Sequence, residues 1–157
     1  GTSRNDISSS EYLYAWHKVK LSPPPYFDLE EEYKVQQTIL DLIRKNLINS
    51  AHDVSDGGLF VTLFESAMHN NLGFDITSDA EIRLDAFLFG ESQSRVIVTV
   101  PMEGEDDFIE MMQKSGVNFC ILGEVNGKEM IVDDLSFGLI EDAKKIYENV
   151  IPELMKS

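Results

Sequence analysis

The segment from Asn49 to Phe64 constrains the fold most, because polar residues give way there to two glycines and then to the apolar pattern of a buried helix. Adjacent glycines at Gly57 and Gly58 let the backbone turn tightly and approach another group closely. The helix that they open presents unpaired N–H donors and the positive end of its dipole. The local sequence therefore favours anionic oxygen at this turn.

Two acidic residues at the same turn limit which anion could bind there. Asp53 and Asp56 would repel a bare phosphate, so a phosphate would need a divalent cation such as Mg²⁺, held by carboxylate and phosphate oxygens. A structural interpretation stays open, in which Asp56 caps the helix and Ser55 helps to shape the turn. Calcium and Walker loops are excluded, because Phe64 stands where an EF-hand needs Glu and no Gly-Lys-Ser/Thr follows the glycines.

A second polar cluster precedes a run of β-branched residues. Glu91, Ser92, Gln93 and Arg95 gather an acid, a hydroxyl, an amide and a guanidinium. Residues 95–100 should form a central strand, since they are nearly all β-branched and are followed by a proline. Carboxylate and amide groups can bind a small polar ligand, and Arg95 can pair with phosphate. The alternative is a structural ion pair between Arg95 and Glu91.

Apolar spacing and turn signals predict the remaining elements. The expected helices are a short one capped by Ser10, then 29–47, 57 to about 70, 105–114, and a last one beginning at Ser136. The helix over 29–47 carries the apolar stripe Leu29, Tyr33, Leu40, Ile43 and Leu47. Further strands are expected over 74–76, 117–125 and 128–133, the last two joined as a hairpin by Asn126-Gly127. This order predicts an α/β fold with a mixed sheet covered by helices.

Length and charge bound the class of protein. The 157 residues suit one domain, and 13 basic against 28 acidic side chains leave a net charge of −15, which opposes nucleic acid and anionic membranes. No apolar run approaches the roughly 20 residues of a membrane helix and no signal peptide is visible, so a cytoplasmic protein is expected. Cys120 is expected as a buried strand thiol.

The N-terminal segment differs in composition from the rest of the chain. Residues 1–27 are polar and Ser-rich at first, and Pro23-Pro24-Pro25 then enforces an extended conformation. We therefore interpret 1–27 as a linker or arm from an upstream domain, and 28–157 as the α/β domain.

Three segments in one order resemble a known family. Ser8–Leu13 is similar to a link between domains, Ser50–Leu59 to a signature with the sequence Ser-Ala-His-Asp-Val-Ser-Asp-Gly-Gly-Leu, and Leu88–Arg95 to a Glu-Ser-Gln segment before a core strand. Together they resemble the C-terminal domain of the phosphoribosylformylglycinamidine synthase family of purine biosynthesis. The wider aminoimidazole ribonucleotide synthetase superfamily is more distantly similar.

The resemblance implies a C-terminal synthetase domain that packs against an upstream domain and closes a ligand cleft. The family's full enzyme is a ligase that uses ATP, Mg²⁺ and glutamine-derived ammonia to convert formylglycinamide ribonucleotide to formylglycinamidine ribonucleotide. Its implied partners are upstream domains of the same enzyme, a glutaminase component or domain, and the small-molecule substrate. Because the chain resembles only the last domain, it is expected to be inactive alone and to contain no catalytic residue.

The expected ligand-binding residues combine both polar clusters. Those for nucleotide or substrate are Ser55, Gly57, Gly58, Glu91, Ser92, Gln93 and Arg95, and those for the metal are Asp53 and Asp56. The resemblance places them in the second of the family's two homologous halves, so they could serve an auxiliary ATP or ADP site. Two alternatives stay open: a scaffold module of the same enzyme, or a domain of another superfamily member such as selenophosphate synthetase or thiamine monophosphate kinase.

Overall fold

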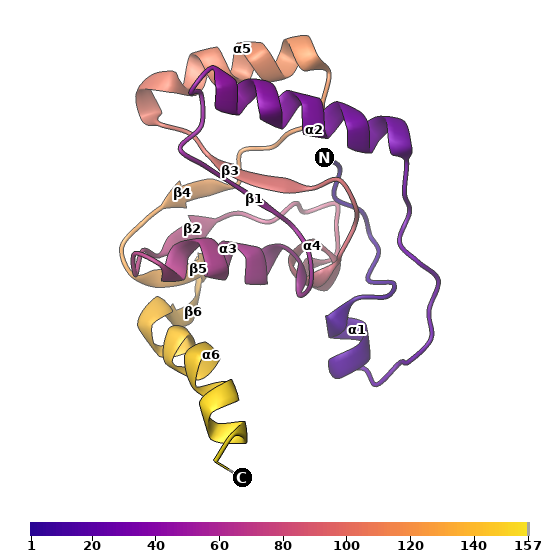
Figure 1. The fold of residues 1–157 in the computed structure, drawn as a ribbon, viewed down its shortest axis with the longest axis vertical. Coiled ribbons are helices and arrows are strands. Elements are labelled where there is room, and N and C mark those ends of the chain that lie inside the picture. Colours follow the sequence, from indigo (N-terminus) through magenta and orange to yellow (C-terminus); the bar gives the residue numbers. More distant parts are fainter. Residues whose placement is uncertain (157) are drawn as a thin grey trace. The chain divides into compact units, whose positions relative to one another are not determined.

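The computed structural model describes residues 1–156 (Figure 1). The chain divides into two compact units. The first unit comprises Gly1–Thr62 and Ala80–Cys120, and the second comprises Leu63–Asp79 and the chain from Ile121 onward. The first contains α1 (Glu11–Ala15), α2 (Leu29–Arg44), β1 (Ser50–Asp53), α4 (Leu84–Phe89), β3 (Val96–Thr99), the 3₁₀ turn η1 (Met102–Gly104) and α5 (Glu105–Ser115). The second contains β2 (Phe74–Ile76), β4 (Gly123–Val125), β5 (Glu129–Val132), β6 (Leu135–Leu139) and α6 (Ile140–Leu154). The helix α3 (Gly58–Met68) begins in the first unit and ends in the second.

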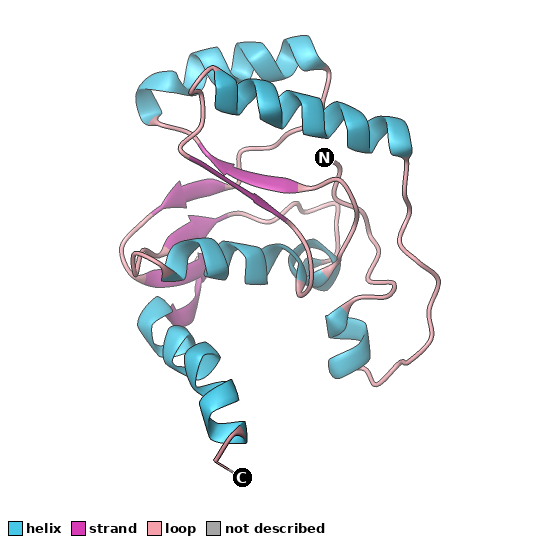
Figure 2. Cartoon of the chain, viewed as in Figure 1, coloured by secondary structure: helices cyan, strands magenta, loops and turns pink. Residues whose placement is uncertain are grey.

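The core of the first unit lies where α2 and α5 pack together over the β1–β3 pair (Figure 2). Leu42 on α2 meets Phe108 and Met112 on α5, and Val98 of β3 packs against this cluster. The predicted start of α2 is confirmed by its N-cap, since the Asp28 carboxylate accepts hydrogen bonds from two backbone N–H groups of the first turn.

Most of the apolar stripe predicted on α2 is not buried, and the helix ends at Arg44, so that the last stripe residue, Leu47, packs against the core from beyond the helix. Leu29, Tyr33 and Ile43 are 70%, 62% and 51% exposed, whereas Leu42 is fully buried. The buried face of α2 consists of Val35, Thr38 and Leu42. The helix is therefore apolar on two faces, of which one forms the core and the other stays open in this unit.

The strand predicted over 95–100 forms as β3, but it is not central within the described part of the chain. It pairs only with β1, antiparallel, with Ser50 opposite Thr99 and Asp53 opposite Val96. The strand β1 itself was missed, because its sequence is polar and its residues are mostly exposed. The short helix α4 was also missed, in a segment that mixes acidic and apolar residues.

The sheet of the second unit has the strand order β4-β2-β5-β6, in which β2 and β5 are parallel and the other neighbours antiparallel. This confirms the mixed sheet, but the predicted hairpin at Asn126-Gly127 is wrong, because β2 lies between β4 and β5. Gly73, just before β2, donates to the Gly127 carbonyl and accepts from the Asn126 N–H, each at 3.0 Å. A Cβ at Gly73 would lie 2.2 Å from the Glu129 carbonyl oxygen. Only glycine therefore allows the Asn126-Gly127 turn to pack this closely against the start of β2.

The hairpin of this sheet lies instead at Asp133-Asp134, which joins β5 to β6 and pairs Val132 with Leu135. Both aspartates adopt positive φ, 51° and 63°, as a two-residue type I′ turn requires. The prediction that Ser136 begins the last helix is therefore wrong: Ser136 lies in β6, and α6 starts at Ile140.

The predicted burial of Cys120 is also wrong, since the residue is exposed and lies outside the strands. The strand expected over 117–125 is confined to its last three residues, which places Cys120 in the loop before β4. Among the helices of residues 1–156, none combines the length and apolar content that crossing a membrane requires.

Candidate functional site

The glycine turn has the backbone shape that its sequence suggests. Gly57 and Gly58 adopt φ of +85° and +71°, and the Gly58 N–H donates to the Ser55 carbonyl at 3.0 Å. A Cβ at Gly58 would lie 2.8 Å from the carbonyl oxygens of Leu88 and Gly90. Gly58 is thus required both for its backbone angle and for its close approach to the segment that precedes Glu91.

An internal carboxylate occupies the turn where an anion was expected. One oxygen of Glu91, Oε1, accepts a hydrogen bond from the Gly57 N–H at 2.8 Å and another from the Glu11 N–H at 2.8 Å. The glycine turn and the first residue of α1 therefore share one acceptor. Sequence analysis missed Glu11, because it is separated from Glu91 by 80 positions and nothing local links the two.

Ser92 and Arg95 are both buried, and the Arg95 side chain is hydrogen-bonded to the same segment. The Arg95 guanidinium donates to the carbonyl oxygens of Gly90 and Ser92 and to the Ser3 hydroxyl. Burial lowers the pKa of Arg95, and the neighbouring Cys120 and Glu91 partly oppose that shift. Because an arginine titrates far above neutral pH, the side chain stays cationic.

An open groove of about 490 Å³ lies in the first unit between α2 and the loop that leads into β3. It is lined by Glu32, Val35, Gln36, Gln37, Ile39, Leu40, Ile43, Asp53, Val54, Gln93, Ser94, Arg95 and Val96. The Ser94 hydroxyl donates to the Glu32 carboxylate at 2.5 Å and joins the two walls. Its size falls within the range of small-molecule sites, and its mixture of apolar and polar walls is typical of them.

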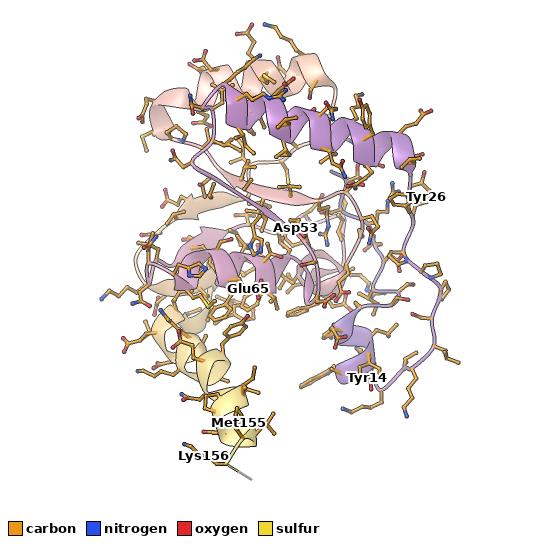
Figure 3. All side chains as sticks on the ribbon, viewed as in Figure 1. Tyr14, Tyr26, Asp53, Glu65, Met155 and Lys156 are labelled. Carbon is orange, nitrogen blue, oxygen red and sulfur yellow. The ribbon has the colours of Figure 1, made fainter. Side chains whose placement is uncertain are left out.

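The structure thus divides the predicted site residues between two places. Asp53, at the end of β1 (Figure 3), lines the groove with Gln93 and Arg95. Ser55, Asp56, Gly57, Gly58, Glu91 and Ser92 do not line it. Sequence analysis missed Glu32 and Gln36 in the groove, although they lie on α2 beside the apolar stripe that was recognised.

Asp53 and Asp56, the two residues predicted to hold a metal, do not belong to a closed metal site within the described residues. Asp53 and Asp56 are both exposed, and residues 1–156 contain no group of three or more His, Cys, Asp or Glu side chains placed to hold a metal. Mg²⁺ is commonly held by one or two carboxylates and completed by water and phosphate oxygens. Because Asp53 lines the groove and Asp56 does not, a magnesium held by both carboxylates stays a prediction.

Comparison with known proteins identifies the domain type. Residues 2–134 match the family described as AIR synthase related protein, C-terminal domain. The chain is 35% identical to phosphoribosylformylglycinamidine synthase subunit PurL of Moorella thermoacetica over 99% of its own length, and 38% identical to that of Caldanaerobacter subterraneus over 85%. These matches cover only 22% and 18% of the two relatives, so the chain spans about a fifth of their length.

Solved structures share the fold at lower identity. The T. maritima PurL complexed with FGAR matches 80% of this chain and 23% of its own, with a TM-score of 0.65 and 18% identity. Thiamine-monophosphate kinase from Stenotrophomonas maltophilia matches 83% of this chain and 52% of its own, with a TM-score of 0.53 and 17% identity. The resemblance and the α/β class expected from the sequence are confirmed, and the chain belongs to the family of AIR synthase related protein C-terminal domains.

Proposed function

We propose that this chain is the C-terminal synthetase domain of a phosphoribosylformylglycinamidine synthase. The whole enzyme would be an ATP-dependent ligase that makes formylglycinamidine ribonucleotide from formylglycinamide ribonucleotide and glutamine-derived ammonia. One observation carries the proposal: 35% identity to a subunit of that name extends over 99% of the chain. Its partners would then be the upstream domains and a glutaminase component or domain. The acidic charge of −15 and the purine pathway together support a cytoplasmic enzyme without nucleic-acid or membrane partners.

The ligands of this domain would be nucleotide and magnesium. T. maritima PurL has been solved with ATP, with ADP and with AMPPCP, and this supports nucleotide binding by the whole enzyme. In this chain Asp53 and Asp56 would hold Mg²⁺, which neutralises phosphate charge when it is bound. The Gln93 amide lines the groove and can both donate to and accept from a polar ligand.

A domain exchange tests the assignment. The corresponding C-terminal region of the Moorella thermoacetica subunit is replaced by this chain, and amidine formation is measured with ATP, Mg²⁺ and ammonium as nitrogen source, so that no glutaminase is needed. We expect the chimera to be active and the same subunit truncated before this domain to be inactive. A chimera that folds and binds its substrate but forms no product would contradict the proposal.

An auxiliary nucleotide-binding role within the same enzyme is the second candidate. Two observations favour this role. The Gly57 N–H already donates to Glu91 and is therefore not available to a ligand, and Asp53 and Gln93 lie in a separate groove where a nucleotide could bind. Calorimetric titration of the 157-residue chain with Mg-ADP decides this point. Micromolar binding would support an autonomous nucleotide site, whereas no binding would leave the domain a scaffold role.

A further inference from the structure

The segment Phe89–Glu91 joins α1 to the start of α3 in two ways. The ring of Phe89 stacks on Tyr12 of α1 at 5.0 Å between centroids and contacts Phe60 of α3 at 5.9 Å. Two residues later, Glu91 accepts from the first residue of α1 and from Gly57, just before α3. Apolar and polar contacts thus connect the same two helices through one short segment.

Close backbone packing gives this junction little freedom. A Cβ at Gly90 would lie 2.4 Å from the Ala86 carbonyl oxygen and 2.5 Å from that of Asp6. A Cβ at Gly58 would meet the Leu88 and Gly90 carbonyl oxygens at 2.8 Å. Because backbones are in contact on both sides, a displacement of the N-terminal segment must be taken up by the segment before Glu91 or by the glycine turn.

The acidic turn itself is anchored at both ends by residues of the second polar cluster. The Val54 N–H donates to the Arg95 carbonyl at 2.9 Å, and the Gly57 N–H donates to Glu91. Asp56 lies between these two anchors. The backbone position of Asp56 therefore depends on Glu91 through the neighbouring Gly57 N–H, and the two carboxylates need not be in contact.

We propose that Glu91 is a positioning residue that couples α1 to the glycine turn, so that the turn keeps its shape only while α1 is docked. Glu91 acts through two backbone N–H groups rather than by contacting a ligand. When α1 undocks, Glu91 loses the hydrogen bond from the Glu11 N–H, and Phe89 loses its stacking partner Tyr12. The glycine turn then loosens. The coupling stands on this geometry alone; its consequence for magnesium and nucleotide at Asp56 rests on the proposed function.

Hydrogen exchange of two amides tests the coupling in the 157-residue chain. Tyr12→Ala weakens the docking of α1 without touching the glycine turn, so it should speed exchange at Glu11 and, through Glu91, at Gly57. We expect the Gly57 amide to exchange roughly 5-fold faster or more, the lower end of typical coupling between sites. Glu91→Ala should accelerate both amides, and Glu91→Gln, which keeps an acceptor oxygen, should restore much of the protection.

Ser94→Ala is the matched control, because it removes the hydrogen bond between Ser94, three residues after Glu91, and Glu32, and leaves the junction intact. It should leave both amides unchanged. The proposal is overturned if Tyr12→Ala accelerates Glu11 while Gly57 keeps its wild-type rate, and this result can be obtained even if Glu91→Ala does not fold. A separate Mg-ADP titration keeps the two ideas apart, since absence of binding would count against a nucleotide site and leave the coupling untouched.

Discussion

The Asp133 carboxylate accepts hydrogen bonds from both the backbone N–H and the hydroxyl of Ser78, each at 2.7 Å. These hydrogen bonds join the loop after β2 to the turn between β5 and β6. The strands β2 and β5 are parallel neighbours in the sheet. They hold together two chain segments that are 55 positions apart.

The same contact predicts a pH-dependent contribution to stability. The hydrogen bond from the Ser78 hydroxyl, and to a lesser extent that from the Ser78 backbone N–H, lowers the pKa of Asp133 below its ordinary 3.8. A carboxylate with a lowered pKa in the folded state stabilises the protein above the pKa of the unfolded chain, and this contribution is lost as the pH falls through the folded value. Asp133→Asn should therefore lower Tm at neutral pH, by an amount that shrinks below about pH 4.

Thermal unfolding at a series of pH values checks this, with Asp134→Asn as the control because it removes the same charge from the neighbouring position of the same turn. Asparagine tolerates the positive φ of both positions, so neither change strains the turn. Equal Tm losses for the two variants, or a loss for Asp133→Asn that persists unchanged at pH 3, would show that the Ser78 contact is not responsible.

A second prediction concerns the glycine turn. Gly58→Ala places a methyl group 2.8 Å from two carbonyl oxygens, whereas Gly127→Ala finds no atom within 4 Å, and both positions have positive φ. The strain of the backbone angle is thus common to both variants, and the difference reports the crowding. We expect Gly58→Ala to be the more destabilising by about 1–3 kcal/mol, the usual cost of overpacking. Urea denaturation of the two variants measures it, and similar free energies of unfolding would contradict the close contact.

The two apolar faces of α2 give a third prediction. Leu42→Ala removes a fully buried side chain beside Phe108 and Met112 and should cost about 2–5 kcal/mol. Leu40→Ala makes the same change on the same helix at a residue that is 37% exposed in the groove, and should cost clearly less. Denaturant unfolding decides between them, and the reverse order would mean that the stripe seen in the sequence is the core face after all.

Sequence analysis succeeded where the signals are local. Ser10 and Asp28 cap α1 and α2, and Gly116 ends α5 in the left-handed conformation, so these helix ends could be predicted from a few neighbouring residues. It failed at Asn126-Gly127, a strong hairpin signal, because β2 inserts between the flanking strands and a pairing of distant segments overrides turn preference. The true hairpin carries Asp133-Asp134, a weaker signal.

The candidate site shows the same division. The glycines and the Glu91–Arg95 segment were recognisable as unusual, and the glycine turn does adopt positive φ. Their grouping was not predictable, because it depends on hydrogen bonds between Glu91 and residues 80 and 34 positions away. The binding of metal or nucleotide at Asp53, Asp56 and Gln93 stays a prediction.

The last prediction addresses the metal directly. If Asp53 and Asp56 hold magnesium for a phosphate ligand, Asp53→Asn and Asp56→Asn should each weaken Mg-ADP binding by at least about tenfold, a loss typical of perturbed metal sites. Asp41→Asn is the control, because it removes an exposed carboxylate from α2 that pairs with Arg44 and lies outside both the turn and the groove. Calorimetric titration with ADP is done once with Mg²⁺ and once with EDTA. Without metal, the difference in ADP affinity between the wild-type chain and the Asp53→Asn and Asp56→Asn variants should disappear. If ADP binds equally well in EDTA, or if Asp41→Asn weakens binding as much, the two aspartates do not act through magnesium and serve only to shape the turn.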